Sequence, residues 1–174
     1  MPGLVVLQGG GPCVANDDLD RRVLPGAGHD RVVVLPTADA YEQPQRLVDT
    51  ALEWGSRIGV AVEPLMVLTR DQADAAAAAA IDGVSVVMLA GDSSGHLRSA
   101  LKDTPVFASI VALLERGGTV IACGPAAGAL CDPMVDQRGG GYAFGLGLVP
   151  GVAVITECER LPHDQLERAH SLAT

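Results

Sequence analysis

Aromatic residues are scarce in this sequence. One Trp, two Tyr and two Phe account for 3% of its 174 residues, whereas hydrophobic residues of all types account for 48%. The core is therefore expected to consist of Val, Leu, Ile and Ala. Proteins that bind single-stranded nucleic acid stack the bases on aromatic side chains, and this composition argues against that class.

Positive charge and paired cysteines are also few. The chain has 12 Lys and Arg residues against 21 Asp and Glu, a net charge of -9. Binding to a phosphate backbone requires a basic surface, so no nucleic-acid partner is expected. Cys13, Cys123, Cys131 and Cys158 show no C-x-x-C spacing. A zinc ribbon or a disulfide framework is not supported, and no metal or cofactor is expected.

Long apolar runs are absent as well. No run approaches the roughly 20 residues that span a bilayer. The apolar run Leu4–Leu7 is short and has no basic segment before it, unlike a signal peptide. We therefore expect no membrane association and a cytoplasmic protein with reduced thiols. The length fits a single domain over residues 1–174.

The sequence does contain strand and helix patterns in alternation. Continuous apolar runs predict strands that are covered on both faces, and helical periodicity separates them. This alternation predicts an α/β fold, a doubly wound and mostly parallel sheet with helices on both faces, in three layers. The predicted buried strands are Leu4–Leu7, Arg31–Leu35, Val84–Leu89 and Thr119–Ala122; the helices between them include Glu42–Ile58 and the segment from Thr104-Pro105 to Arg116.

Other elements are predicted from local signals. Pro64 either makes Val60–Leu68 an edge strand or splits it. The capping box Thr69–Gln72 is expected to open an alanine-rich helix that reaches Ile81. Near the C-terminus, Val152–Thr156 is predicted to be a short strand and Pro162–Leu172 a helix.

Glycine-rich or polar turns follow residues 7, 35, 89 and 122. In an open α/β sheet, these turns lie at the carboxyl edge, where ligands bind. The most informative of them is Gly124-Pro125-Ala126-Ala127-Gly128, which has the G-x-nucleophile-x-G pattern of a nucleophile elbow. Its centre is alanine, and a methyl group cannot attack a carbonyl.

Together these motifs resemble the S51 serine peptidases, which include dipeptidase E and cyanophycinase. The order is the family's: the Gly9–Gly11 turn, Val32–Ala38, Gly91-Asp92, the elbow and Gly145–Gly151. The resemblance covers nearly the whole chain. It implies the class I glutamine amidotransferase-like fold, which is flavodoxin-like, and a hydrolase of the serine-peptidase type.

The departures from the family pattern bear on activity. The resemblance places the nucleophilic serine at Ala126 and the catalytic histidine at Glu157. A serine requires a positioned base, so the loss of both predicts a non-peptidase with a remnant pocket for a small molecule or peptide. Backbone N–H groups near Gly91 and Ala127 are its expected oxyanion side. The expected pocket residues are Gly10, Gly91, Asp92, Ser93, Gly124, Ala126, Ala127 and Glu157.

Two alternatives remain open. The chain could be an active hydrolase with another nucleophile, such as Cys123, or a structural or regulatory subunit. Ser93, Ser94 and His96 are interpreted mainly as helix-capping residues. The family normally continues beyond Pro162–Leu172 with further strands. An uncovered sheet edge favours association, so a homodimer is expected.

Overall fold

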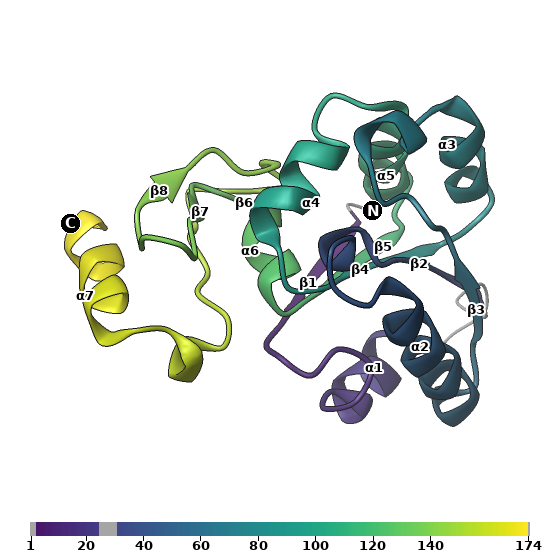
Figure 1. Cartoon of the computed structure of the whole chain (residues 1–174). Helices are drawn as coiled ribbons and strands as arrows, with labels where there is room; N and C mark the ends of the chain where they lie inside the picture. The colour runs from purple at the N-terminus through teal and green to yellow at the C-terminus, as the bar shows by residue number, and fades with distance from the viewer. Residues whose placement is uncertain (1–2, 25–30, 174) are drawn as a thin grey trace.

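A parallel β-sheet forms the centre of the described part of the chain, residues 3–24 and 31–173 of the computed structural model (Figure 1). The sheet has β1 at one edge and β3 at the other. In the flavodoxin order the first strand lies inside the sheet. Here β1 lies at the edge, so the two strand orders differ in the position of the first strand. The order of the five described strands is β1 (Leu4–Gln8), β5 (Thr119–Cys123), β4 (Val86–Ala90), β2 (Arg31–Leu35) and β3 (Ala61–Pro64).

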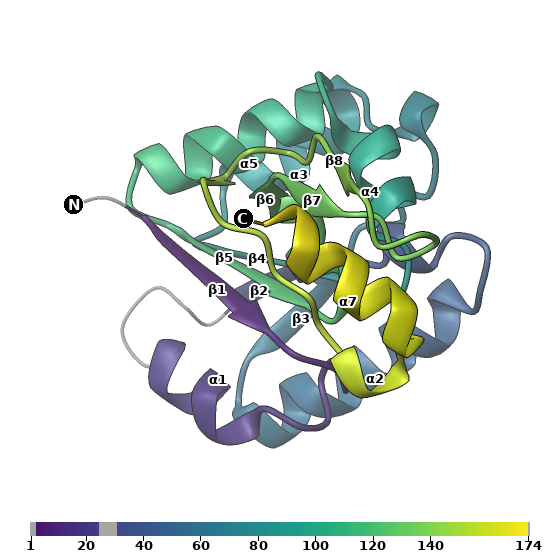
Figure 2. The same ribbon diagram turned by 90° about the vertical axis from the view of Figure 1, so that its left-hand side faces the viewer.

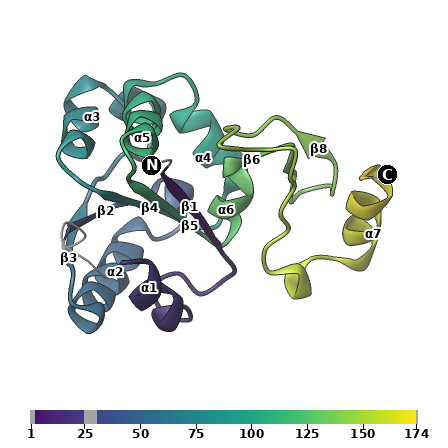
Figure 3. The same ribbon diagram turned by 180° about the vertical axis from the view of Figure 1, so that it is seen from behind.

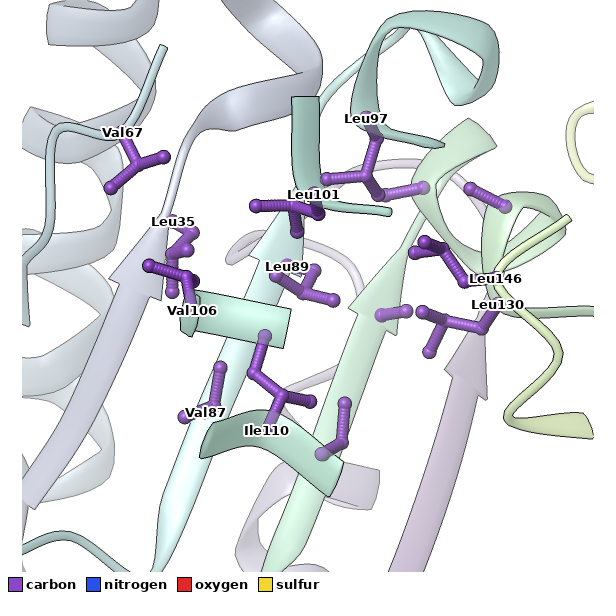
Figure 4. Packing of buried hydrophobic residues seen from close by; sticks show 14 of the residues in the cluster. Leu35, Val67, Val87, Leu89, Leu97, Leu101, Val106, Ile110, Leu130 and Leu146 are labelled. Atoms are coloured by element: carbon purple, nitrogen blue, oxygen red, sulfur yellow. The ribbon is translucent and has the colours of Figure 1, made fainter. Parts of the chain in front are cut away.

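Helices cover both faces of the sheet, which confirms the three-layer α/β/α prediction (Figure 1). On one face, α1 (Asp17–Val23) and α2 (Pro44–Ile58) pack on alternate strand residues such as Val32 and Val34. The other alternate residues, such as Leu35 and Leu89, form a second core with the remaining helices (Figure 4). That face carries α3 (Ala75–Asp82), α4 (Ser94–Leu101), α5 (Pro105–Glu115) and α6 (Pro125–Leu130).

The strand register places the expected turns at one edge of the sheet. Gln8 pairs with Cys123, Cys123 pairs with Ala90, and Leu89 pairs with Leu35. The carboxyl ends of β1, β5, β4 and β2 are therefore level with one another. The turns after these strands meet at this carboxyl edge, as the sequence predicts.

A buried polar network joins β1 to the α1–α2 layer. Asp20 is 1% exposed and accepts hydrogen bonds from the side-chain amide of Gln8 and from the indole N–H of Trp54. Burial raises the pKa of the Asp20 carboxyl, and the bonds from Gln8 and Trp54 offset part of that rise. The network fixes α1 and α2 to the end of β1 through side chains that are far apart in sequence.

One predicted helix start is wrong. The Thr69 capping box forms, but it opens η2 (Arg70–Gln72), a short 3₁₀ helix, and not the alanine-rich helix. Helix α3 instead begins after Asp74, whose side chain accepts the N–H of Ala77 at 2.9 Å. Asp is as good an N-cap as Thr, and here the second signal in the sequence sets the helix boundary.

The C-terminal segment lies beyond the carboxyl edge of the sheet, to one side of the main body (Figures 1 and 3). Its short strands pair as β6 (Cys131–Asp132) with β9 (Val149–Pro150), and as β7 (Met134–Val135) with β8 (Tyr142–Ala143). Helix α7 (His163–Leu172) packs beside the β7–β8 hairpin (Figure 2). The Tyr142 hydroxyl donates to the carbonyl of Ala169 at 3.0 Å and holds the two together.

Val152–Thr156 is not a strand, contrary to the prediction. Apart from an isolated bridge between Val152 and Asp132, this segment has irregular backbone. Beyond this bridge, Val154–Thr156 packs against Pro125 and Gly128 of α6 instead of joining a sheet. Separately, none of the helices in the described residues is long and apolar enough to cross a membrane.

Candidate functional site

The turns after β2 and β4 are joined at the carboxyl edge of the sheet. The backbone N–H of Asp92 donates to Asp39 Oδ1 at 2.8 Å, and the N–H of Ser93 donates to the carbonyl of Ala38 at 3.0 Å. Gly91 has φ +124°, and a Cβ there would come within 2.6 Å of the Asp39 nitrogen. Only glycine fits this close approach. Burial raises the pKa of Asp39, while the N–H of Asp92 opposes that rise.

The elbow after β5 connects to the turns on both sides of it. The N–H of Gly124 contacts the carbonyls of Gln8 and Gly9, and the N–H of Ala126 donates to the carbonyl of Gly91 at 3.3 Å. The N–H of Ala127 donates to the carbonyl of Gly124 at 2.9 Å. The structure thus brings Gly91, Gly124, Ala126 and Ala127 together. Both alanine N–H groups already have main-chain acceptors, so neither is free to serve as an oxyanion donor.

The elbow is sealed from solvent. Ala126 and Ala127 are 0% exposed, and every residue of α6 is buried. The segment Val154–Thr156 packs against Pro125 and Gly128 and leaves a cavity of about 10 Å³. This is about the minimum space for one water molecule. A side chain at position 126 therefore has no access to a ligand in this arrangement.

Glu157 lies against the turn after β1. A Cβ at Gly10 would collide with the Glu157 carboxyl group, so the absence of a side chain at residue 10 makes room for it. The backbone of Glu157 is left-handed (φ 52°), and its side chain is 16% exposed. Arg160 donates to its Oε2 at 3.0 Å. Glu157 therefore serves as the acceptor in a local ion pair.

Cys123 has the properties of a core residue. It is 0% exposed, and its thiol donates to Gln8 Oε1 at 3.0 Å. Burial raises the pKa of the Cys123 thiol well above its ordinary value, and burial also raises that of Cys13 to about 12. Because the thiolate is the nucleophile, a thiol held neutral in this way reacts poorly. The geometry disfavours Cys123 as a replacement for the missing serine.

A pocket of about 640 Å³ opens beside the elbow, between α4 and the β7–β8 hairpin. Ser93 and Ser94 line it at the start of α4, and His96 and Arg98 line it further along the helix. Ser93 is the N-cap, and its hydroxyl accepts the N–H of His96 at 3.2 Å. The opposite wall comes from the hairpin and includes Arg138 and Phe144, and Tyr41 completes the rim. We call this cavity the α4 pocket.

A second pocket, of about 380 Å³, lies on the other side of Asp92. Asp39, Glu42 and Asp92 line it, with Arg46 as the basic residue among its lining. Among residues 3–24 and 31–173, no group of three or more His, Cys, Asp or Glu side chains has the arrangement of a metal site.

The expected pocket residues are thus divided among three places. Gly91, Gly124, Ala126 and Ala127 form the buried junction under the C-terminal segment. Asp92 and Ser93 lie on opposite sides of the turn after β4, each in a different pocket. Gly10 and Glu157 form a contact of their own.

Sequence reasoning missed the aromatic and basic residues of the α4 pocket. Tyr41 follows the turn after β2, Arg98 lies inside α4, and Phe144 lies in a glycine-rich stretch. One signal was present in the sequence. In a chain with so few aromatic residues, an aromatic residue surrounded by glycines is an unusual placement for a core side chain.

The parallel sheet with the elbow after β5 is a fold that this chain shares with solved structures of peptidases. A peptidase from an acI-B1 actinobacterium has a similar structure, with a TM-score of 0.82 and 20% sequence identity over 97% of this chain and 75% of that one. A candidate peptidase E protein from Listeria monocytogenes EGD-e has a TM-score of 0.70 and 15% identity, over 98% of this chain and 88% of that one.

No family model and no curated protein matches the sequence. At these identities, the structural similarity shows the shared fold alone. The resemblance to S51 peptidases that the motifs predict is confirmed at that level.

Proposed function

We propose that this chain is a non-peptidase homologue of the S51 serine peptidases that retains a pocket for a small molecule or peptide. The observation that carries the proposal is the state of position 126. An alanine stands where the resemblance places the nucleophile, and it is fully buried in α6, whose residues Pro125 and Gly128 pack against Val154–Thr156. Acyl transfer requires an exposed nucleophile with a base within hydrogen-bond reach.

The surroundings of position 126 support the same conclusion. Glu157, at the position of the expected base, is paired with Arg160 and packed on Gly10. Cys123, the alternative nucleophile, is buried and has a raised pKa. The α4 pocket, in contrast, is open and has both polar and aromatic walls. Binding without hydrolysis therefore agrees best with the geometry.

We also propose that the protein acts in the cytoplasm. The four cysteines are free, and three of them are buried where a reduced thiol packs as a small hydrophobic group. This proposal is independent of the one on activity.

The test is a hydrolysis assay on dipeptides with N-terminal aspartate and on isoaspartyl dipeptides. We expect no turnover above the uncatalysed rate for the wild type. Ala126→Ser, alone or combined with Glu157→His, is also expected to remain inactive, because the new hydroxyl would lie under the covering segment. Circular dichroism checks that each variant is folded.

Hydrolysis by the wild type that is abolished by a serine-directed or thiol-directed reagent would contradict the proposal. In that event, Cys123→Ala serves as the matched variant. Loss of turnover in Cys123→Ala would identify the alternative nucleophile. Activity that appears only in the double variant would mean that the covering segment opens, while leaving the wild type a non-peptidase.

A further inference from the structure

We propose that the α4 pocket binds a small organic anion that carries an aromatic ring. This inference names the ligand class of the pocket described above and rests on the proposed binding function. It is drawn from three features of the pocket: two exposed aromatic rings, an arginine whose Nε has no hydrogen-bond partner in the described part of the chain, and a local excess of positive charge.

The aromatic rings are the first feature. Tyr41 is 80% exposed and Phe144 is 79% exposed, and both line the α4 pocket. The sequence has only one Trp, two Tyr and two Phe, and two of these five aromatic side chains line this cavity. Aromatic side chains gain much from burial. Leaving two of them uncovered on the same pocket indicates a surface that a ligand covers.

The ring of Tyr41 is also held in place. It meets the ring of His96 edge to face, with 4.8 Å between the ring centroids. His96 is anchored in turn, because its Nε2 lies 2.8 Å from the carbonyl oxygen of Leu68. Tyr41 therefore offers a positioned aromatic face on which a planar ligand can stack, although the side chain itself is exposed.

Arg98 is the second feature. Its Nε atom is buried and has no hydrogen-bond partner among the described residues. A buried N–H group without an acceptor lowers the stability of the folded state, because it has lost its hydrogen bonds to water. The guanidinium group presents its donors in a fork that matches the two oxygens of a carboxylate or the oxygens of a phosphate. Because Arg98 lines the α4 pocket, an anionic ligand there would accept hydrogen bonds from the guanidinium group.

The third feature is the charge around Arg98. The charged side chains that line the pocket are Arg98, Arg138 and Asp136, with His96 beside them. Two permanent cations against one carboxylate give a positive pocket in a chain whose net charge is -9. Ser94 lies one helical turn before Arg98 on the same face of α4, in the first turn of the helix, where the helix dipole also favours negative charge.

The size of the pocket fits a small molecule. About 640 Å³ falls within the range of about 300–1,000 Å³ that is typical of small-molecule sites. A ring stacked between Tyr41 and Phe144 with its acidic group on Arg98 uses all three features. Either a carboxylate or a phosphate can supply the acidic group, and the experiment separates them.

The experiment measures binding of four matched probes by isothermal titration calorimetry. Naphthoate and naphthyl phosphate carry the same ring with different anionic groups, naphthylmethanol is the neutral ring, and cyclohexanecarboxylate is an anion without an aromatic ring. We expect saturable binding of one or both aromatic anions. The neutral probe and the non-aromatic probe should bind at least about tenfold more weakly, because each lacks one of the two interactions.

Variants then test the named residues. Arg98→Gln should weaken the aromatic anion about tenfold or more, since hydrogen bonds to charged groups contribute about 1.5–3 kcal/mol. Phe144→Ala should weaken it about two- to tenfold. Arg22→Gln removes one positive charge from an exposed site on α1, and it should leave the affinity within about twofold because that charge is distant and screened.

Chemical-shift mapping on the wild type provides a test that does not depend on any variant. The aromatic anion should shift amide signals of residues 93–99 and 136–144. Absence of saturable binding by both aromatic anions, equal binding of naphthylmethanol, shifts confined to other residues, or an unchanged affinity in a folded Arg98→Gln variant would each overturn the inference.

The binding experiment and the hydrolysis assay fail in different ways, so failure of this inference can be told apart from failure of the proposed function. Hydrolysis of peptides by the wild type would contradict the non-peptidase proposal without changing any probe affinity. Conversely, absence of probe binding would leave the result of the hydrolysis assay as it stands.

Discussion

Asp20 links the stability of the fold to pH. It is a nearly fully buried carboxyl group that accepts hydrogen bonds from Gln8 and Trp54. Because burial raises its pKa, the folded state holds the Asp20 proton more tightly than the unfolded state does. The contribution of Asp20 to the free energy of unfolding is therefore full below the ordinary pKa of about 3.9. It is lost as the pH rises through the raised value.

Replacing Asp20 by Asn tests this linkage. Asn offers one acceptor oxygen to two donors, so we expect Asp20→Asn to lower the free energy of unfolding by about 1–3 kcal/mol at acidic pH. The deficit should shrink as the pH rises, because only the wild type loses stability from ionising Asp20. Urea denaturation at several pH values measures it.

Asp18→Asn is the control for this prediction. The Asp18 side chain is 94% exposed on the same helix, so its replacement should have little effect at any pH. A deficit in Asp20→Asn that grows with rising pH would contradict the assignment.

The roles of individual residues were the part least predictable from sequence. The Asp17–Val23 helix is predictable from its pattern, but the burial of Asp20 beneath Trp54 depends on a contact between residues 34 positions apart. The same holds for Arg98, because the other walls of the α4 pocket come from two segments that are distant in sequence. Local sequence determines which side chains are available, and the tertiary arrangement determines which of them meet.

At the scale of elements, the elbow depends on the backbone of Gly124. Its φ of 62° and ψ of -145° belong to a region that is almost restricted to glycine. A Cβ at this residue would have ordinary space, with the carbonyl oxygen of Gly91 at 3.9 Å. Conformational strain, and not steric collision, therefore restricts this position.

Gly124→Ala is expected to lower the free energy of unfolding by about 1–3 kcal/mol, measured by urea denaturation. The matched control is Gly83→Ala at the end of α3, where a Cβ would meet nothing within 4 Å and the backbone has φ -98°. That variant should stay within about 1 kcal/mol of the wild type. Equal stability of Gly124→Ala and the wild type would show that the elbow backbone is not held in this conformation.

Elements with a strong local signal were predicted well. The run Arg31–Leu35 is a strand with the predicted bounds, and Thr104 caps α5 through the N–H of Phe107. Val152–Thr156 was predicted wrongly because its apolar residues cover α6 rather than a neighbouring strand. Apolar side chains indicate burial, but burial against a helix and burial within a sheet look the same in so short a segment.

At the scale of the whole molecule, the outer edge of β1 is a candidate surface for self-association. β1 is an edge strand of the described sheet, and Leu4 on it is 48% exposed. An unpaired edge presents free main-chain donors and acceptors to another strand. We therefore propose a homodimer that forms through β1, in line with the expectation from the sequence.

Sedimentation velocity at micromolar concentration tests this prediction. The wild type should sediment as a dimer, and Leu4→Lys should shift it to the monomer because a charge on the edge blocks strand pairing. Leu19→Lys is the matched control, since Leu19 is an exposed leucine on α1 away from the edge. A monomeric wild type, or a dimer that both variants leave intact, would contradict the proposal.

The three-layer architecture was predictable because it follows from patterns repeated along the whole chain. Four continuous apolar runs and the helices between them leave few ways to bury every strand on both faces. The division of the carboxyl edge into a sealed elbow and an open α4 pocket was not predictable. It depends on how residues 131–161 fold back over α6.

The pairing of β1 with β5 has a consequence for synthesis of the chain. Gln8 and Cys123, which are aligned at the ends of these strands, are 115 residues apart. Translation produces β1 first, yet its strand partner in the described sheet leaves the ribosome after β2, β3 and β4. Such long-range pairing is slow and leaves apolar surface uncovered in the meantime. Until Thr119–Cys123 has emerged, the nascent chain carries an unpaired first strand, and chaperone binding is expected to matter most at this stage.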